Sequence, residues 1–331
     1  MGRLTRFLSV FVAAVGLLAM TGCEAKPPRS AVPESPRLAA SKLPRLVEHD
    51  RFTIAPVKVH GVRVHELSGL AWDEDEQLLY AVTDKGNVIH FRLKLEGNKI
   101  MAVEPVYAAP LTDAGENSAG RGGLDSEDLI VLNAHNGTPG DSELVVVVEG
   151  APPRILRFSP AGAMLGEMAV PPPLDDLRNY RGGNKGLESL AFHPQHGLIT
   201  APELPLEQQP KNLHTVYARD QHWSFLAHPV KDSRLKALEV LADGNLLALE
   251  RSFSGSPKQL VVSLRYVDLA ACPAKGACAA KDLAVFPQSL ANFEGLADIG
   301  KHRFLAVSDH NRDDPLGTTL MLFSLQYEGA P

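Results

Sequence analysis

Acidic residues recur in pairs along this chain, and their types and spacing are its clearest chemical feature. Five segments open with a glutamate followed by apolar residues, and each continues into a second apolar run that ends in another acid. The leading glutamates are Glu66, Glu127, Glu188, Glu239 and Glu294. The second acids are Asp84, Glu149, Glu203, Glu250 and Asp309.

If these carboxylates converge they need compensation, because like charges in a narrow, partly dry site raise one another's pKa. Calcium is the natural compensating ion, since it accepts several hard oxygen ligands in flexible geometry. The alternative, left equally open, is that the carboxylates accept backbone N–H hydrogen bonds between neighbouring repeats. The candidate calcium ligands are Glu66, Asp84, Glu127, Glu188, Glu239, Glu250, Glu294 and Asp309.

The apolar runs around these acids are short and separated by Gly, Pro, Asn and Asp, which favours strands over helical repeats. Each repeat is long enough for a four-stranded sheet, but the last is one strand short. Residues 52–59 precede the first repeat and can supply the missing strand, which would close a ring and protect its edges. We therefore predict an all-β fold, a single β-propeller of five blades, with six as the alternative, closed by an N-terminal strand.

A propeller predicts where the acids lie. The innermost strand of each blade starts at one face, and the second strand returns antiparallel, so both acids of a repeat arrive at the same face. Cationic and amide residues also fall in the predicted loops of this face, where they can either receive an anionic substrate or pair with the carboxylates. They are Arg121, Arg181, Asn184, Lys185, Arg251, Asn292, Asn311 and Arg312.

The N-terminus has the pattern of a bacterial lipoprotein precursor. Arg3 and Arg6 precede an apolar run over residues 7–20, which is too short to span a bilayer and leads to Cys23. We expect a signal peptide over residues 1–22, a lipidated Cys23 with a flexible tether over 23–47, and the propeller over 48–328. This predicts a cell-envelope protein on the periplasmic side. Glu24 favours the outer over the inner membrane.

The remaining cysteines, Cys272 and Cys278, frame a short loop, and an exported location permits a local disulfide between them. The formal charge is −6 and becomes −8 once Arg3 and Arg6 leave with the signal peptide. A negative balance disfavours nucleic acid as a partner. We expect a monomer.

Several ordered motifs resemble one known family. They are Asn184-Lys-Gly-Leu-Glu-Ser-Leu-Ala, Leu249-Glu-Arg-Ser-Phe253 and Asn292-Phe-Glu-Gly-Leu-Ala with Val307-Ser-Asp-His-Asn311. They look like the phytase-like domain family, also called "esterase-like activity of phytase", over roughly residues 60–325. The resemblance implies phosphoester or ester hydrolysis.

For a hydrolase of this kind, Glu188, Glu239, Glu294 and Asp309 would hold calcium, and Arg251 and Lys185 would grip the anionic group. His310 stands where the family usually has a second aspartate, and it would protonate the leaving group. Two hypotheses remain. One is a calcium-dependent hydrolase of a small anionic or ester substrate, and the other is a non-catalytic, calcium-stabilised binding module for an envelope partner or ligand.

Overall fold

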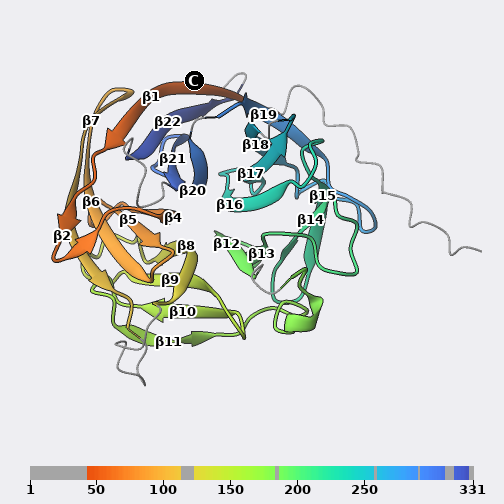
Figure 1. Cartoon of the computed structure of the whole chain (residues 1–331), viewed down its shortest axis with the longest axis horizontal. Coiled ribbons are helices and arrows are strands. Elements are labelled where there is room, and N and C mark those ends of the chain that lie inside the picture. The colour runs from red at the N-terminus through yellow and green to blue at the C-terminus, as the bar shows by residue number, and fades with distance from the viewer. Residues whose placement is uncertain are drawn as a thin grey trace, which may run out of the picture. The chain divides into compact units, whose positions relative to one another are not determined.

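The described part of the chain folds into five antiparallel sheets of four strands each, arranged as a ring (Figure 1). The computed structural model describes residues 43–112, 123–182, 186–256, 259–289, 291–309 and 317–327. Within these ranges the one helix is a short 3-10 turn, η2 (Leu177–Asn179). The prediction of a five-bladed propeller is confirmed.

Each blade starts with its innermost strand, which faces the centre of the ring in Figure 1. Blade 1 is β4 (Leu67–Asp73), β5 (Leu78–Thr83), β6 (Asn87–Glu96) and β7 (Lys99–Pro110). Blade 2 is β8 (Asp125–Leu132), β9 (Glu143–Glu149), β10 (Arg154–Phe158) and β11 (Met164–Met168). Blade 3 is β12 (Leu187–His193), β13 (Gly197–Pro202), β14 (Leu213–Tyr217) and β15 (His222–Leu226).

Blade 4 is β16 (Arg234–Val240), β17 (Leu246–Ser254), β18 (Gln259–Val267) and β19 (Ala280–Pro287). Blade 5 takes β20 (Asn292–Asp298), β21 (Arg303–Asp309) and β22 (Thr318–Gln326) from the end of the chain and β1 (Arg45–Ile54) from its beginning. β1 pairs antiparallel with β22, from Arg45 opposite Gln326 to Ile54 opposite Thr318. The predicted closure by an N-terminal strand is therefore confirmed.

The closing strand lies earlier in the sequence than expected. Residues 52–59 contain only the end of β1, followed by the start of a separate hairpin. That hairpin consists of β2 (Lys58–Val59) and β3 (Val62–Arg63) and belongs to no blade. His60 and Gly61 form its two-residue turn with φ values of 47° and 87°. Positive φ at both positions is what a tight turn between twisted strands requires.

The apolar core lies between neighbouring blades. Five clusters of buried residues each join two adjacent blades, and the last joins blades 5 and 1. The four valines of β9, Val145 to Val148, illustrate the pattern, because alternate residues of this strand face blade 1 and blade 3. Every inner strand is thus covered on both sides by the neighbouring blades. This packing fixes how the inner strands are placed relative to one another.

The predicted disulfide is present, with Cys272 and Cys278 sulfurs 2.03 Å apart in the β18–β19 connection. No helix among the described residues is long and apolar enough to cross a membrane.

Candidate functional site

All five inner strands carry an irregularity at the same point. The pairing with the second strand shifts between Leu67 and Gly69, and equivalent shifts occur in the other four blades. A β-bulge of this kind bends the strand and re-aims the side chain of the extra residue. The bulged residues are Ser68, Glu127, Glu188, Lys236 and Glu294.

Only three of the five leading glutamates occupy the bulge of their blade. Glu127, Glu188 and Glu294 occupy the bulge of blades 2, 3 and 5, whereas blade 1 has Ser68 and blade 4 has Lys236. Glu66 precedes β4, where it still lies near the mouth of the channel beside Lys85. Glu239 lies further along β16, where its carboxylate accepts a hydrogen bond from the backbone N–H of Asp298 at 3.1 Å.

The second acids of the five repeats are also not all equivalent in the structure. Asp125 pairs with Glu149 in blade 2 and Asn292 with Asp309 in blade 5, while the corresponding pair in blade 4 is Arg234 with Arg251. Glu250 is one residue earlier, so its side chain points to the other face of the strand. The structure therefore does not bring Glu239 and Glu250 to the acidic mouth.

Glu250 instead belongs to a buried polar cluster between blades 3 and 4. It is fully buried and accepts hydrogen bonds from Ser233 Oγ at 2.7 Å and Arg265 Nη1 at 3.0 Å. The ring of His214 lies beside it, with Nε2 3.7 Å from the carboxylate. Burial lowers the pKa of His214, which favours the neutral form of this histidine in the folded protein.

His214 predicts an acid sensitivity of folding. A histidine with a depressed folded pKa binds its proton more tightly when unfolded, so stability is lost as pH falls below about 6.5. Chemical denaturation between pH 7.5 and 5 should show this loss in the wild type and a smaller loss in His214→Leu. The exposed His222→Leu in the same blade is the matched control. Equal pH dependence in both variants would contradict the assignment.

Blade 4 places three cations at the channel mouth where other blades place acids. Lys236 is 5% exposed, and its Nζ contacts Glu188 directly and lies 3.5 Å from Glu294 and 3.7 Å from Glu203. These three carboxylates come from blades 3 and 5, the two neighbours of blade 4, so the ammonium joins three adjacent blades. It occupies the kind of position that a bound cation would take.

Two arginines complete this cationic side. Arg234 Nη1 donates to both oxygens of Glu203, at 3.0 and 3.1 Å. Arg251 donates to Glu203 at 3.2 Å through Nη2, and to Glu294 through Nη1. The carboxylates of blades 3 and 5 that sequence reasoning assigned to calcium, Glu188 and Glu294, are thus compensated by the chain's own cations.

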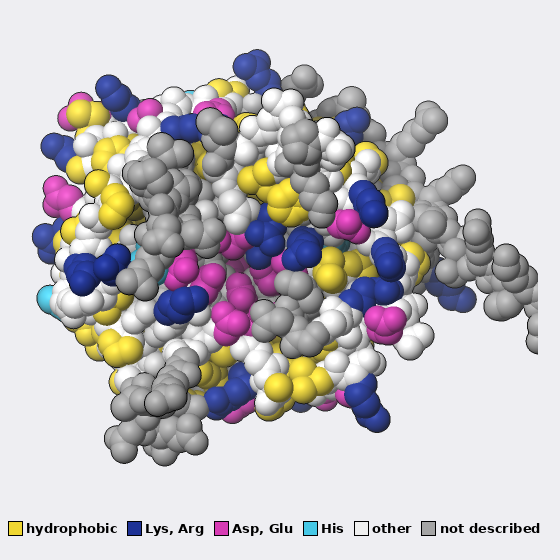
Figure 2. Space-filling view, in the orientation of Figure 1, with side chains coloured by type: hydrophobic (Ala, Val, Ile, Leu, Met, Phe, Trp, Pro, Cys, Tyr) yellow, Lys and Arg dark blue, Asp and Glu magenta, His cyan; other side chains and the backbone are white. Residues whose placement is uncertain are grey.

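The carboxylates of blades 1 and 2 have a different environment. Oxygen atoms of Asp125, Glu127 and Glu149 all lie within 4.8 Å of one another, and we call these residues the acid triad. Figure 2 shows acidic side chains gathered at the centre of this face, with Lys and Arg side chains directly beside them. Burial, together with the charges of Asp84, Asp125 and Glu149, raises the pKa of Glu127 well above its usual value.

Asp84 lies near the triad, and Asp309 lies near Asp84. Burial and the charge of Asp309 raise the pKa of Asp84 to about 7, and burial and the charge of Glu294 raise the pKa of Asp309 to about 6. One buried oxygen of each, Oδ1, has no hydrogen-bond partner in the described part of the chain. Closely spaced carboxylates with raised pKa values and unsatisfied oxygens fit a hard cation such as calcium.

Some of the predicted acids have the alternative role, in which a carboxylate accepts a hydrogen bond from a backbone N–H group of a neighbouring blade. Glu149 accepts a hydrogen bond from the N–H of Gly186 at the start of blade 3, and Glu239 does so from Asp298 of blade 5. Asp128, beside Glu127, accepts one from Leu190 at 2.9 Å. Backbone capping is therefore observed for Glu149, Glu239 and Asp128, and Glu149 is also a member of the acid triad.

The predicted cationic loop residues divide in a similar way. Arg181 donates to the backbone carbonyls of Pro205 and Glu207, both at 2.8 Å, and so holds the loop before β14. Asn292 donates to Glu294 at 2.8 Å. Six predicted residues lie outside the described residues, and so does the predicted lipidation site Cys23; the six are Arg121, Asn184, Lys185, His310, Asn311 and Arg312.

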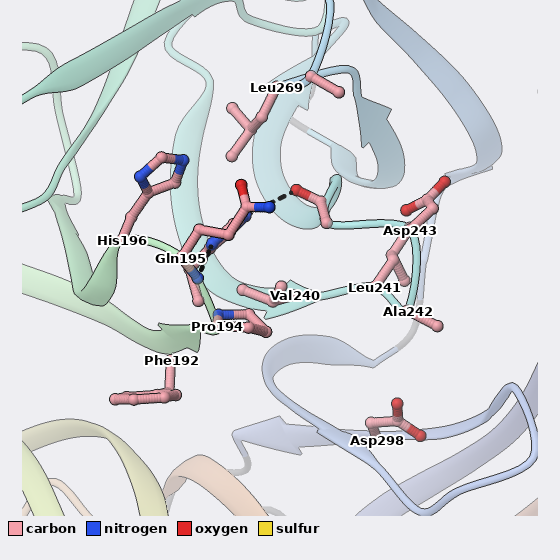
Figure 3. Close-up of a pocket in the computed structure, with 13 residues that line it drawn as sticks. Phe192, Pro194, Gln195, His196, Val240, Leu241, Ala242, Asp243, Leu269 and Asp298 are labelled. Carbon is pink, nitrogen blue, oxygen red and sulfur yellow. Dashed lines mark hydrogen bonds between the residues drawn. The ribbon is translucent and has the colours of Figure 1, made fainter.

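A second concavity, of about 480 Å³, lies at the other ends of β12, β16 and β20. Figure 3 shows Phe192, His196 and Asp298 around it. His193 donates through Nε2 to the carbonyl of Gly244 at 3.0 Å and accepts at Nδ1 from the N–H of Gln195. Both ring nitrogens of His193 are therefore used in hydrogen bonds to backbone groups.

The fold and the charged channel mouth define a five-bladed β-propeller with an acidic site at one end of its channel. The chain belongs to the Phytase-like family, described as "Esterase-like activity of phytase", whose family model matches residues 62–312. No curated protein matches the sequence.

Three solved structures illustrate its distant structural likenesses. The Dos1 propeller has 10% identity and a TM-score of 0.35, over 82% of this chain and 71% of that one. A gluconolactonase from Xanthomonas campestris, XC5397, has 16% identity and a TM-score of 0.41, over 92% and 100%. The PQQ-bound aldose sugar dehydrogenase from Streptomyces coelicolor has 12% identity and a TM-score of 0.43, over 89% and 100%. None of these likenesses bears on activity.

Proposed function

We propose that this protein is a calcium-dependent hydrolase of phosphoesters or esters that acts at the channel mouth. The observation that carries the proposal is the division of the mouth into two halves. The acid triad with Asp84 and Asp309 offers carboxylate oxygens to a cation, and the cationic blade 4 lies across the channel from it. Membership of a family described by esterase-like activity supports the reaction class.

In this proposal the acid triad holds calcium, and Asp84 and Asp309 complete its surroundings. Bound calcium would polarise the oxygen of the scissile group and neutralise developing charge. Arg251 keeps the carboxylates of Glu203 and Glu294 oriented on the opposite side. Lys185 and His310 retain the roles that the family resemblance implies, gripping the anionic group and protonating the leaving group.

A non-catalytic binding module is the second candidate, and a specific observation favours it. The carboxylates of Glu188, Glu203 and Glu294 are already paired with Lys236, Arg234 and Arg251. Half of the mouth is therefore ordered by the chain's own ion pairs, which suits a preorganised surface for an envelope protein or ligand.

The test is calcium titration by calorimetry of residues 23–331 carrying Cys23→Ser, with parallel assays on a chromogenic phosphate ester and a chromogenic acetate ester. Turnover that needs calcium would support the hydrolase. Calcium binding without turnover would replace it with the binding module. The absence of calcium binding would overturn both forms of the metal proposal.

We also propose that the protein is anchored in the cell envelope through lipid on Cys23, facing the periplasm and preferentially in the outer membrane, as a monomer that does not bind nucleic acid. Acyl chains on one cysteine hold a soluble domain on a membrane without a spanning helix. Cys23→Ser should therefore move the protein from the membrane fraction to the soluble fraction, as measured by immunoblot after ultracentrifugation. Unchanged membrane association of that variant would contradict the anchor.

A further inference from the structure

The β2–β3 hairpin stands beside the acidic mouth. β1 ends at Ile54 and β4 begins at Leu67, and both residues lie at the end of their blade that carries the acids. The hairpin is held in place by a hydrogen bond from Val64 N to Val57 O at 2.9 Å and by the ring of His60, which meets Tyr107 edge-on at 5.3 Å. It is an ordered addition to the propeller.

A cavity of about 710 Å³ lies between this hairpin and the turn that joins β5 to β6. We call it the hairpin pocket. Lys58 and Arg63 line it from the hairpin, Lys85 from the turn, and His65 and Glu66 from the chain that leads into blade 1. Three permanent cations therefore face one carboxylate, a composition opposite to that of the neighbouring acid triad.

The floor of the pocket is rigid. Thr83 Oγ1 accepts hydrogen bonds from the N–H groups of Lys85 and Asn87, both at 3.3 Å. Gly86 has a φ of 66°, and a Cβ there would lie 2.7 Å from the carbonyl oxygen of Leu124. The turn that carries Lys85 is thus pressed against blade 2 and cannot shift without disturbing it.

The cations of the pocket are available to a ligand. Within the described ranges, Lys58 and Arg63 are exposed and have no ion-pair partner. Lys85 Nζ lies 3.7 Å from Glu66 Oε2, and its side chain is 63% exposed. The carboxylate of Glu66 is also 3.1 Å from His65 Nδ1.

We propose that the hairpin pocket binds a phosphate group, supplied either by a phosphomonoester or by inorganic phosphate. The planar fork of Arg63 can donate two hydrogen bonds to phosphate oxygens, and the lysines add charge-assisted bonds on either side. Glu66 contributes to the raised pKa of Asp309, which places the pocket next to the acidic mouth. The site requires neither calcium nor hydrolysis, so it goes beyond the proposed function.

The test is phosphate binding in EDTA by residues 23–331 with Cys23→Ser, measured by calorimetry with inorganic phosphate and separately with phenyl phosphate. We expect saturable binding that weakens by about 10-fold or more in Arg63→Gln and in Lys58→Gln, since a charge-assisted hydrogen bond is lost in each. Tighter binding of phenyl phosphate would identify a phosphomonoester as the ligand, and equal binding would identify the free anion.

Arg92→Gln is the matched control, because Arg92 is an exposed arginine of β6 in blade 1 and lies outside the pocket. Phosphate should also raise the melting temperature of the wild type and not that of Lys58→Gln/Arg63→Gln. No binding by the wild type, or equal weakening by Arg92→Gln and Arg63→Gln, would overturn the proposal. Because EDTA removes calcium, failure here leaves the calcium titration to decide the proposed function separately.

Discussion

Lys236→Met is expected to lower the free energy of unfolding by about 3–5 kcal/mol at neutral pH without calcium. The reason is that it leaves buried carboxylates without the cation that compensates their charge. Lys236 is 5% exposed and lies among Glu188, Glu203 and Glu294. Methionine has similar length and no charge, so the loss reports the ammonium and not a cavity. The measurement is urea denaturation in EDTA at pH 7.5.

The same mechanism predicts two ways to restore stability. Lowering the pH toward 4 should shrink the difference from wild type, because protonation removes the uncompensated charge. Calcium should also recover part of the loss if it enters the vacated position. Lys85→Met is the control, since Lys85 is 63% exposed in its ion pair with Glu66 and should cost less than about 1 kcal/mol. A Lys236→Met protein as stable as the control at every pH would refute the role of Lys236 as internal counter-ion.

The architecture was predictable because the chain repeats one pattern of short apolar runs. Runs such as Val145 to Val148 favour strands, because valine is β-branched, and the shortfall of one strand after β22 was best met by another from the N-terminus. Each blade buries its faces against the next, so the number of repeats determines the number of blades. The local disulfide followed from the short spacing of its cysteines.

The site was predicted less accurately because a β-bulge is a property of strand pairing and leaves no mark in composition. Matching on glutamate aligned Glu66 and Glu239 with true bulge residues, although the bulges of their blades hold Ser68 and Lys236. A slip of one residue reverses which way a side chain points, so Glu250 was predicted for a position at the mouth that Arg251 occupies.

A different signal in the sequence would have found the bulges. In four blades the bulged residue lies between a large apolar residue and a small one that precedes Leu, as in Leu187-Glu-Ser-Leu, Leu235-Lys-Ala-Leu and Phe293-Glu-Gly-Leu. The small residue has a packing reason, because a Cβ at Gly295 would lie 2.9 Å from the carbonyl oxygen of Ser68. Packing between inner strands, and not charge, fixes the alignment of the repeats.

The second large effect is expected at the acid triad. There, Glu127→Gln should lower the stability of the fold relative to wild type when calcium is bound and raise it when calcium is absent. Glu127→Gln removes one carboxylate of the triad. If the triad holds calcium, affinity should fall by at least about 10-fold in calorimetry, since loss of even an indirect partner of a metal ligand costs that much. Glu104→Gln, which changes an exposed glutamate of β7, should leave calcium binding unchanged.

Without calcium, Glu127→Gln should be more stable than the wild type. A carboxyl group whose folded pKa is raised binds its proton more tightly in the folded state, so its ionisation costs stability as pH rises above the unfolded value of about 4.5. Glutamine avoids that cost, so Glu127→Gln should melt a few degrees higher than wild type at pH 8 in EDTA, and this gain should vanish near pH 4. Excess calcium should make the wild type the more stable protein. A variant that is less stable than wild type in EDTA at pH 8 would mean that Glu127 has a structural role, because without calcium the carboxylate stabilises the fold only through hydrogen bonds or the charge of Lys236.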